Sequence, residues 1–238
     1  MEIAQGIFYG IGVGPGDPEL LTVKAINAIK NSEVIIAPKT EKKSDSLALT
    51  IAQPYLRADV QIVYQTFPMV KNFEDSPEIF SDNVQEILSY LNTGKNVGFL
   101  TLGDPMFFST YIYIFKLLKN HGVQIETVAG IPAFLAIAAK IGYRVAYGNE
   151  ILSIIPATAE TEKITAALKS SDDVVLMKVY KNFGEVAQIL KNENLTENAV
   201  LVSRCGLEDE KIIADIVSCK NEKLNYLSTI LTRKNQKS

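Results

Sequence analysis

Short runs of apolar and β-branched residues alternate with segments of helical period along the first half of the chain. Four such runs predict strands, at 8–13, 33–37, 60–64 and 97–102. The segments 20–30, 82–92 and 111–119 carry apolar residues every three or four positions and therefore predict amphipathic helices. Gly94 and Gly122 end the last two of these helices. Strands that alternate with helices are typical of βαβ units and a mostly parallel sheet.

After Gly122 the predicted helices become fewer and the strands follow one another more closely. Strands are predicted at 124–128, 152–155, 174–179, 200–203, 212–217 and 226–232, with helices at 133–141, 162–168 and 184–191. This order favours a mixed sheet with some antiparallel pairing. We therefore expect an α/β protein with two domains, an N-terminal α/β domain at 1–122 and a C-terminal mixed α/β domain at 123–238.

Composition and charge narrow the class of protein. The chain has 238 residues, 47% hydrophobic and 21% charged, with a net charge of −3. This acidic balance argues against a nucleic-acid partner, because such binding depends on many Lys and Arg contacts to phosphate. The apolar runs break well before the roughly 18 residues of a membrane span. The first residues lack the basic and apolar segments of a signal peptide, so we expect a cytoplasmic protein without a membrane partner.

Histidine and cysteine are too scarce for several kinds of catalytic site. The single histidine, His121, follows a predicted helix, where a cation suits the helix dipole. The two cysteines, Cys205 and Cys219, are too far apart for a C-x-x-C motif. The sequence therefore predicts neither a transition-metal site nor a Ser-His-Asp triad.

The first motif, Gly-Ile-Gly-Val-Gly-Pro-Gly-Asp-Pro at 10–18, lies where the first strand gives way to the first helix. Its four glycines indicate close backbone approach or positive φ. The G-x-G-x-x-G dinucleotide fingerprint and the G-x-x-x-x-G-K-[ST] phosphate loop both fail here, so we expect neither NAD nor ATP. Asp17 and Pro18 are the expected N-cap and first residue of the helix, which leaves a tight turn and a ligand loop as open alternatives.

Two further turns join a predicted strand to a predicted helix. Thr-Leu-Gly-Asp-Pro-Met-Phe-Phe-Ser-Thr at 101–110 places Asp104 at the carboxyl end of a strand, the edge where open α/β sheets bind ligands. Asp104 is therefore a candidate to hold a ribose hydroxyl, to contact substrate or to move a proton, or else it only forms the turn before Pro105. Ala-Gly-Ile-Pro-Ala-Phe at 129–134 is the third turn, and its small residues allow a close approach to backbone.

These three turns, in this order and spacing, resemble the motifs of the tetrapyrrole (corrin/porphyrin) methylase family. The resemblance covers nearly the whole chain. Within the family, the chain is most similar to the branch that methylates carbon 20 of precorrin-2 or cobalt-factor II. Four segments carry this similarity: 101–111, Ile-Ile-Pro-Ala at 154–157, Val-Leu-Met-Lys-Val at 175–179 and Tyr-Leu-Ser-Thr-Ile at 226–230. The family implies two α/β domains with S-adenosylmethionine in the cleft between them, and S-adenosylhomocysteine as its product.

The resemblance also implies a set of site residues and a homodimer. Carried over by position, the cofactor-binding residues are Pro15, Leu102, Gly103, Asp104 and Phe107 from the N-terminal domain and Pro132, Ala133, Met177 and Gly206 from the C-terminal domain. Asp104 is in addition the candidate catalytic residue. The substrate's carboxylates need cationic partners, for which the candidates are Lys39, Arg57, Lys71, Arg144, Lys178 and Arg204.

The reaction expected from this resemblance belongs to cobalamin biosynthesis. Methyl transfer from a sulfonium to a carbon nucleophile mainly requires alignment and exclusion of water, so no metal is required. Other readings stay open at this point: methylation at another ring carbon, methylation of ribosomal RNA or of a diphthamide precursor, and a non-catalytic sensor of tetrapyrrole or S-adenosylmethionine.

Overall fold

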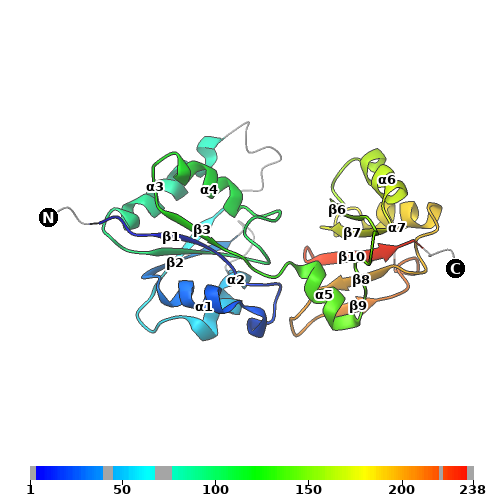
Figure 1. The fold of residues 1–238 in the computed structure, drawn as a ribbon, viewed down its shortest axis with the longest axis horizontal. Coiled ribbons are helices and arrows are strands. Elements are labelled where there is room, and N and C mark those ends of the chain that lie inside the picture. Colours follow the sequence, from blue (N-terminus) through cyan, green and yellow to red (C-terminus); the bar gives the residue numbers. More distant parts are fainter. Residues whose placement is uncertain (1–3, 40–44, 68–76, 220–221, 235–238) are drawn as a thin grey trace. The chain divides into compact units, whose positions relative to one another are not determined.

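The chain forms two compact α/β units, residues 1–132 and 133–238 (Figure 1). The computed structural model describes residues 4–39, 45–67, 77–219 and 222–234. The division falls after Pro132, whereas the sequence predicted it after Gly122. The difference arises because strand β5 (Ile125–Val128) pairs with β1 (Phe8–Gly12) and so completes the sheet of the first unit.

The described residues of the first unit form one parallel sheet in the strand order β3-β2-β4-β1-β5. The remaining strands are β2 (Val34–Lys39), β3 (Gln61–Thr66) and β4 (Val97–Thr101). The helices are α1 (Val23–Lys30), α2 (Leu47–Ala52), α3 (Ser81–Leu91) and α4 (Tyr111–Lys119), with short 3-10 turns at Pro18–Leu20, Gln53–Tyr55 and Pro77–Phe80. The predicted parallel α/β unit is confirmed.

Helices cover both faces of this first sheet, α1 and α2 on one face and α3 and α4 on the other (Figure 1). Side chains alternate between the two cores, as strand geometry requires. Ile11, Ile35 and Leu100 pack in the cluster with α1 and α2. Phe8 and Phe99 point the other way and pack with α3 and α4. Burial on both faces explains why these strands read as almost continuous apolar runs.

The strand order creates a switch point between β1 and β4. From β1 the chain passes through α1 to β2, beyond β4, whereas from β4 it passes through α4 to β5, beyond β1. The two crossovers therefore leave in opposite directions and use opposite faces of the sheet. In open α/β sheets, ligands bind outside the carboxyl ends of the strands at such a point.

The second unit has a mixed sheet, which confirms the predicted antiparallel pairing. Its described strands lie in the order β6-β7-β10-β8-β9, and β6 and β7 are parallel while β10 is antiparallel to both β7 and β8. The strands are β6 (Leu152–Pro156), β7 (Asp173–Met177), β8 (Val200–Ser203), β9 (Lys211–Ile213) and β10 (Ser228–Arg233). The helices are α5 (Ala133–Ile141), α6 (Thr161–Ser170) and α7 (Phe183–Asn192).

Helices α6 and α7 bury their apolar sides in one core with the second sheet. Ile164 and Leu168 of α6 and Leu190 of α7 belong to the same buried cluster as Leu176 and Ile230 of the sheet. Helix α5 contacts β10. Among the described residues, no helix is both long and apolar enough to cross a membrane.

Two local predictions differ from the structure. The strand predicted at 212–217 is shortened to β9, because Asp215 turns the chain by accepting hydrogen bonds from the backbone N–H groups of Val217 and Ser218, both at 3.2 Å. Helix α2 was not predicted, although Ser46 caps it through a hydrogen bond from the Leu49 N–H at 3.4 Å.

A buried carboxyl group lies at the beginning of β7. Asp173 is 2% exposed, and neither of its carboxyl oxygens accepts a hydrogen bond from an N–H or O–H group of the described residues. Burial, followed by the charge of Glu150, raises the pKa of Asp173 to about 6, and Arg144 and Arg233 only partly oppose this. The ionised form therefore lowers the stability of the second unit above about pH 6, and this loss fades as the pH falls towards the ordinary value of 3.8.

Candidate functional site

The first motif turn follows β1 at the switch point. Gly14 adopts φ +76°, a left-handed conformation that glycine reaches without strain. Pro15 and the glycines on either side of it are buried. Asp17 then caps the 3-10 turn by accepting a hydrogen bond from the Glu19 N–H at 2.9 Å, with Pro18 at its start. The predicted cap is confirmed, but it begins a 3-10 turn, and α1 begins only after Thr22.

The second motif turn is hydrogen-bonded directly to the first. Gly103 N–H donates to the Gly14 carbonyl at 2.8 Å, and Gly14 N–H donates to the Gly103 carbonyl at 3.4 Å. The Val13 N–H also donates to the Thr101 carbonyl at 3.0 Å. Main-chain pairing therefore continues beyond the ends of β1 and β4 and joins the two turns into one piece of backbone.

The third motif turn packs against the other two through glycine. A Cβ atom added to Gly130 would lie 2.1 Å from the Gly103 carbonyl oxygen and 2.8 Å from the Gly12 backbone. A Cβ atom added to Gly12 would lie 2.6 Å from the Gly130 nitrogen. Such distances are far inside van der Waals contact, so neither position can hold a side chain. The three turns thus meet backbone against backbone at the carboxyl edge of β4, β1 and β5.

Asp104 holds the second and third turns together. One carboxylate oxygen accepts a hydrogen bond from the Met106 N–H at 2.9 Å, which shapes its own turn. The other oxygen accepts a hydrogen bond from the Gly130 N–H at 3.0 Å, 26 residues away. The structure therefore gives Asp104 both the turn-forming role and a longer-range one that the sequence did not predict. Its action on cofactor or substrate stays a prediction.

The loop after Asp104 returns to the sheet through hydroxyl groups. The Ser109 hydroxyl lies 2.7 Å from the Thr101 hydroxyl and accepts a hydrogen bond from the Tyr111 N–H at 3.1 Å. Between these anchors, Met106 and Phe108 are exposed, and Phe108 has φ +49°. Hydrogen bonds therefore hold the loop at both ends, and these two apolar side chains between the ends are exposed to solvent.

The predicted cofactor-binding residues divide between the two units. Pro15, Leu102, Gly103, Asp104, Phe107 and Pro132 belong to the first unit and lie in or beside the three turns. Pro132 is 3.7 Å, at its Cα, from where a Cβ of Gly103 would stand. Ala133, Met177 and Gly206 belong to the second unit, at the start of α5, the end of β7 and the turn after β8 respectively. Gly12, Gly14 and Gly130 were not among the predicted site residues, although each lies in a predicted motif.

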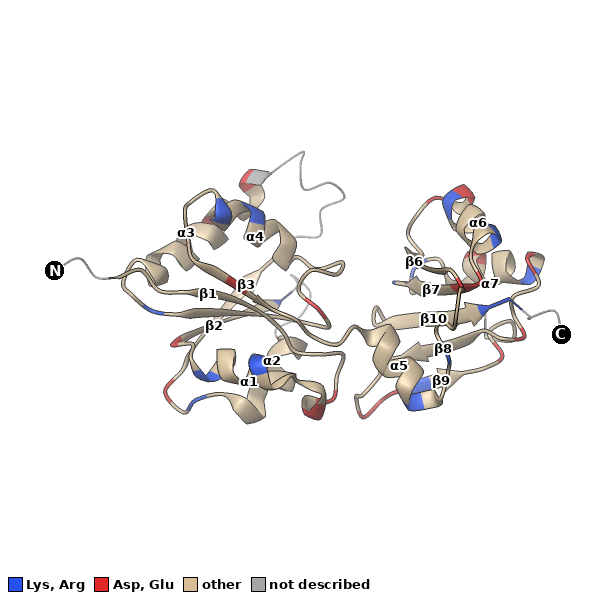
Figure 2. Ribbon diagram, in the orientation of Figure 1, with Lys and Arg blue, Asp and Glu red and all other residues tan. Residues whose placement is uncertain are grey.

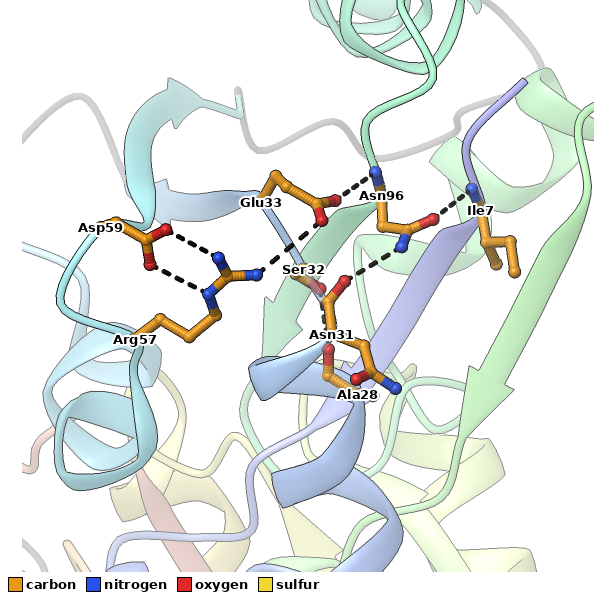
Figure 3. A network of polar contacts seen from close by, with 8 residues as sticks. All are labelled: Ile7, Ala28, Asn31, Ser32, Glu33, Arg57, Asp59 and Asn96. Atoms are coloured by element: carbon orange, nitrogen blue, oxygen red, sulfur yellow. Dashed lines mark hydrogen bonds and ion pairs between the residues drawn. The ribbon is translucent and has the colours of Figure 1, made fainter. Parts of the chain in front are cut away.

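The candidate cations for the substrate's carboxylates are placed very differently. Arg57 lies at the amino edge of the first sheet, where it contacts Asp59 at 2.7 Å and Glu33 at 3.8 Å (Figure 3). Glu33 in turn accepts a hydrogen bond from the Asn96 N–H, just before β4. This network occupies the edge opposite the three turns and accounts for Arg57 without a ligand.

Arg144 is likewise held by its own chain, because both carboxylate oxygens of Glu150 lie 2.8 Å from its Nη1. Lys71 lies outside the described residues. Lys39 ends β2, with its Nζ 5.8 Å from the centre of the Tyr64 ring. Lys178 and Arg204 directly follow β7 and β8. Along the described elements, Lys and Arg are interspersed with Asp and Glu (Figure 2).

A parallel α/β unit with glycine turns at its switch point, followed by a unit with a mixed sheet, defines a two-domain α/β protein. The switch point is the position at which open α/β sheets bind small molecules. The comparisons with known proteins give the family. Residues 8–218 match the model of the Tetrapyrrole (Corrin/Porphyrin) Methylases, and the chain belongs to this family.

One curated relative is similar over almost its whole length. The cobalt-precorrin-2 C(20)-methyltransferase of Salmonella typhimurium is 34% identical over 97% of this chain and 97% of its own.

Solved structures of the same fold include a cobalt precorrin-4 methyltransferase, with a TM-score of 0.76, 24% identity, and coverage of 95% of this chain and 94% of the other. Another is a uroporphyrin-III C-methyltransferase from Thermus thermophilus in complex with S-adenosylhomocysteine, with a TM-score of 0.68, 20% identity, and coverage of 96% and 98%. The predicted fold is confirmed.

Proposed function

We propose that this protein is an S-adenosylmethionine-dependent methyltransferase that methylates carbon 20 of precorrin-2 or cobalt-factor II in cobalamin biosynthesis. The similarity to the Salmonella cobalt-precorrin-2 C(20)-methyltransferase carries this proposal, because it extends over 97% of both chains at 34% identity. The name of that relative also favours the cobalt-loaded substrate over the metal-free one.

The edge formed by the three turns suits S-adenosylmethionine. Adenosine needs apolar contacts, and the ribose and amino-acid ends need main-chain hydrogen-bonding groups. Leu102, Phe107 and Pro132 supply partly buried apolar side chains at this edge. Gly14 and Gly103 keep main-chain atoms close to the edge without side chains in front of them. The T. thermophilus enzyme, which has the same fold, is described in complex with S-adenosylhomocysteine.

The cofactor supplies an activated methyl group on a sulfonium, and the chain supplies alignment. Transfer to carbon needs the nucleophile, methyl and sulfur in line, so a rigid binding edge contributes more than acid–base chemistry. The hydrogen bonds between the turns at Gly14 and Gly103 and between Asp104 and Gly130 make this edge rigid. We propose that Asp104 also faces the reacting centre, either as an anchor of the cofactor or as acceptor of the proton lost from the methylated carbon. Contacts of the cofactor with Ala133, Met177 and Gly206 remain part of the same proposal.

The test is incubation of the purified protein with S-adenosylmethionine and either the metal-free or the cobalt-loaded dimethylated tetrapyrrole. We expect one added methyl by mass, at carbon 20 by NMR, and faster turnover of the cobalt-loaded form. A new methyl at another carbon would replace the proposed position while keeping the reaction class. Binding of both ligands without formation of S-adenosylhomocysteine would show a sensor instead of an enzyme.

We further propose a cytoplasmic homodimer. An acidic chain with a cobalamin-biosynthetic relative supports the compartment. Exposed large apolar side chains in the second unit, such as Leu135, Tyr147 and Ile151, support association with a second copy.

A further inference from the structure

Two strands of the second unit, one on each side of β10, end at the same edge of its sheet. Strands β7 and β8 are both antiparallel to β10, so they run in the same direction. Met177 of β7 and Val202 of β8 both lie opposite Thr229 of β10. Since neighbouring strands are about 4.8 Å apart, the carboxyl ends of β7 and β8 are roughly 10 Å apart across β10.

The residues that follow these two strands are cationic and have an unusual backbone. Lys178 comes directly after β7 with φ +59°, and Arg204 comes directly after β8 with φ +57°. Long side chains disfavour this left-handed conformation, which glycine adopts freely. Strained residues of this kind gather at functional sites. Here two of them place a positive charge at equivalent ends of the two strands that flank β10.

The surroundings of both charges suit an added anion. Burial lowers the pKa of Lys178, because its ammonium has lost part of its hydration. Arg204 is oriented by Asp209, which contacts its Nε. Among the described residues, no hydrogen bond to the Arg204 η nitrogens is found, so this end of the guanidinium is available to a carboxylate.

Aromatic side chains flank the same edge. Tyr180 follows Lys178 by two residues, and Tyr226 precedes β10 by two residues. Their rings meet edge to face with centroids 5.2 Å apart, and Tyr226 is 43% exposed. The edge therefore combines aromatic side chains with two cations, and these suit an aromatic macrocycle that carries carboxylates around its rim.

We propose that Lys178 and Arg204 bind carboxylates of the tetrapyrrole substrate and set its position on the second unit. This inference rests on the proposed function, and it selects two of the six candidate cations. Arg57 and Arg144, like Arg204 through its Nε, pair with carboxylates of the chain itself, but they lie near the amino ends of strands. Lys178 and Arg204 lie at carboxyl ends, next to the predicted cofactor residues Met177 and Gly206.

The first experiment measures equilibrium binding of the cobalt-loaded dimethylated tetrapyrrole by its absorbance change, in the full chain. Lys178→Gln and Arg204→Gln should each weaken binding roughly tenfold to a hundredfold, as expected for the loss of a hydrogen bond to a charged group. Lys191→Gln removes an equally charged side chain from the exposed side of α7 and should leave binding unchanged. Binding of the two Gln variants within twofold of the parent would overturn the proposal.

The second experiment identifies the source of the carboxylate, because S-adenosylmethionine carries one too. Calorimetry compares S-adenosylhomocysteine with 5′-methylthioadenosine, which lacks the amino-acid end. If the substrate is the ligand, the Gln variants bind both compounds as the parent does. A selective loss of S-adenosylhomocysteine binding would assign the two cations to the cofactor and overturn the proposal.

A third variant separates binding from folding. Lys178→Gly removes both the charge and the backbone strain, so it should weaken tetrapyrrole binding while the melting temperature stays level or rises. Asn194→Gly, at a left-handed position after α7, is the matched control for the backbone effect alone. A fall in melting temperature for Lys178→Gly with unchanged tetrapyrrole binding would show a structural role and overturn the proposal.

Failure of this inference is distinct from failure of the proposed function. If the parent protein binds the tetrapyrrole but releases no S-adenosylhomocysteine, the function fails and the binding series still decides the role of the two cations. If the parent methylates carbon 20 and the variants bind normally, the function stands and the inference is wrong.

Discussion

Replacing Asp104 with Asn tests whether this residue positions the motif turns or acts in the reaction. In the parent, one carboxylate oxygen accepts from the Met106 N–H and the other from the Gly130 N–H, at 2.9 and 3.0 Å. Asparagine has a single side-chain oxygen. Its amide group must therefore point a donor at one of two N–H donors, whichever way it rotates. Asn thus keeps the turn but cannot keep both bonds.

The expected cost follows from that lost bond. A hydrogen bond to a charged group contributes about 1.5–3 kcal/mol, and an unpaired donor adds to the loss. For a chain of this size, each kcal/mol lowers the melting temperature by about 2–4 °C, so we expect a fall of roughly 3–12 °C. Because the bond joins the second and third turns, binding of S-adenosylhomocysteine should weaken by at least about tenfold.

Three measurements on the same variant distinguish the two roles: thermal unfolding, calorimetry with S-adenosylhomocysteine, and single-turnover methyl transfer at saturating cofactor. Asp17→Asn is the matched control for stability. Asp17 also accepts from the backbone N–H two residues on, at 2.9 Å, but no second bond is found among the described residues. Its replacement should therefore change the melting temperature by less than about 2 °C, since one oxygen suffices.

The outcomes separate cleanly. A lower melting temperature and weaker cofactor binding, with a normal single-turnover rate at saturation, would establish a positioning role. A rate lowered by about 10²–10⁴-fold with unchanged stability would establish acid–base action. If stability, binding and rate all match the parent, the reasoning from the two hydrogen bonds is refuted.

Four further predictions concern other parts of the molecule. Asp173→Asn should raise stability at pH 7.5 by about 1–3 kcal/mol, since the folded-state pKa of about 6 exceeds the ordinary value. The gain should shrink below pH 5 in urea titrations, and a pH-independent gain would contradict it. Gly130→Ala should abolish S-adenosylhomocysteine binding or lower stability markedly, because its Cβ would lie 2.1 Å from the Gly103 carbonyl; Ala129→Ser, at an exposed neighbour, should do neither. Calorimetry should detect S-adenosylmethionine binding in the micromolar range, tighter S-adenosylhomocysteine binding and no NAD or ATP binding, and binding of NAD alone would exclude the proposed cofactor. Sedimentation should give the mass of two chains at micromolar concentration, and a single-chain mass there would disprove the dimer.

Local pattern was sufficient for much of the fold. The predicted bounds of α4, α5 and β8 agree with the structure at both ends, because Gly122 and Gly142 stop the two helices with positive φ and the strand is a short buried run. Helix α2 was missed because six residues hold too few turns for a clear apolar stripe. The predicted domain boundary, after Gly122, differs from the division after Pro132, because Gly122 ends helix α4 and does not end the first unit. The next strand, β5, pairs back with β1, which local sequence does not show.

The sequence predicted three motif turns, and the structure brings these turns into contact, but the sequence did not predict why their glycines are needed. The motif glycines suggested close approach to a ligand, yet Gly12 and Gly130 are required by each other's backbone. Gly14 and Gly103 have room for a Cβ atom, with nearest atoms at 3.5 and 3.7 Å, and are required by positive φ instead.

These two requirements predict different responses to mutation. A steric glycine tolerates no side chain, whereas a conformational glycine tolerates residues that accept left-handed backbone, such as Asn. Spacing between glycines along one loop therefore matters less here than contact between loops that lie far apart in the sequence, such as those of Gly12 and Gly130. The same logic applies to Lys178 and Arg204, whose left-handed backbone no sequence pattern revealed. Where a chain keeps a long cation at a position that glycine would occupy without strain, the charge itself is the simplest reason for it to be there.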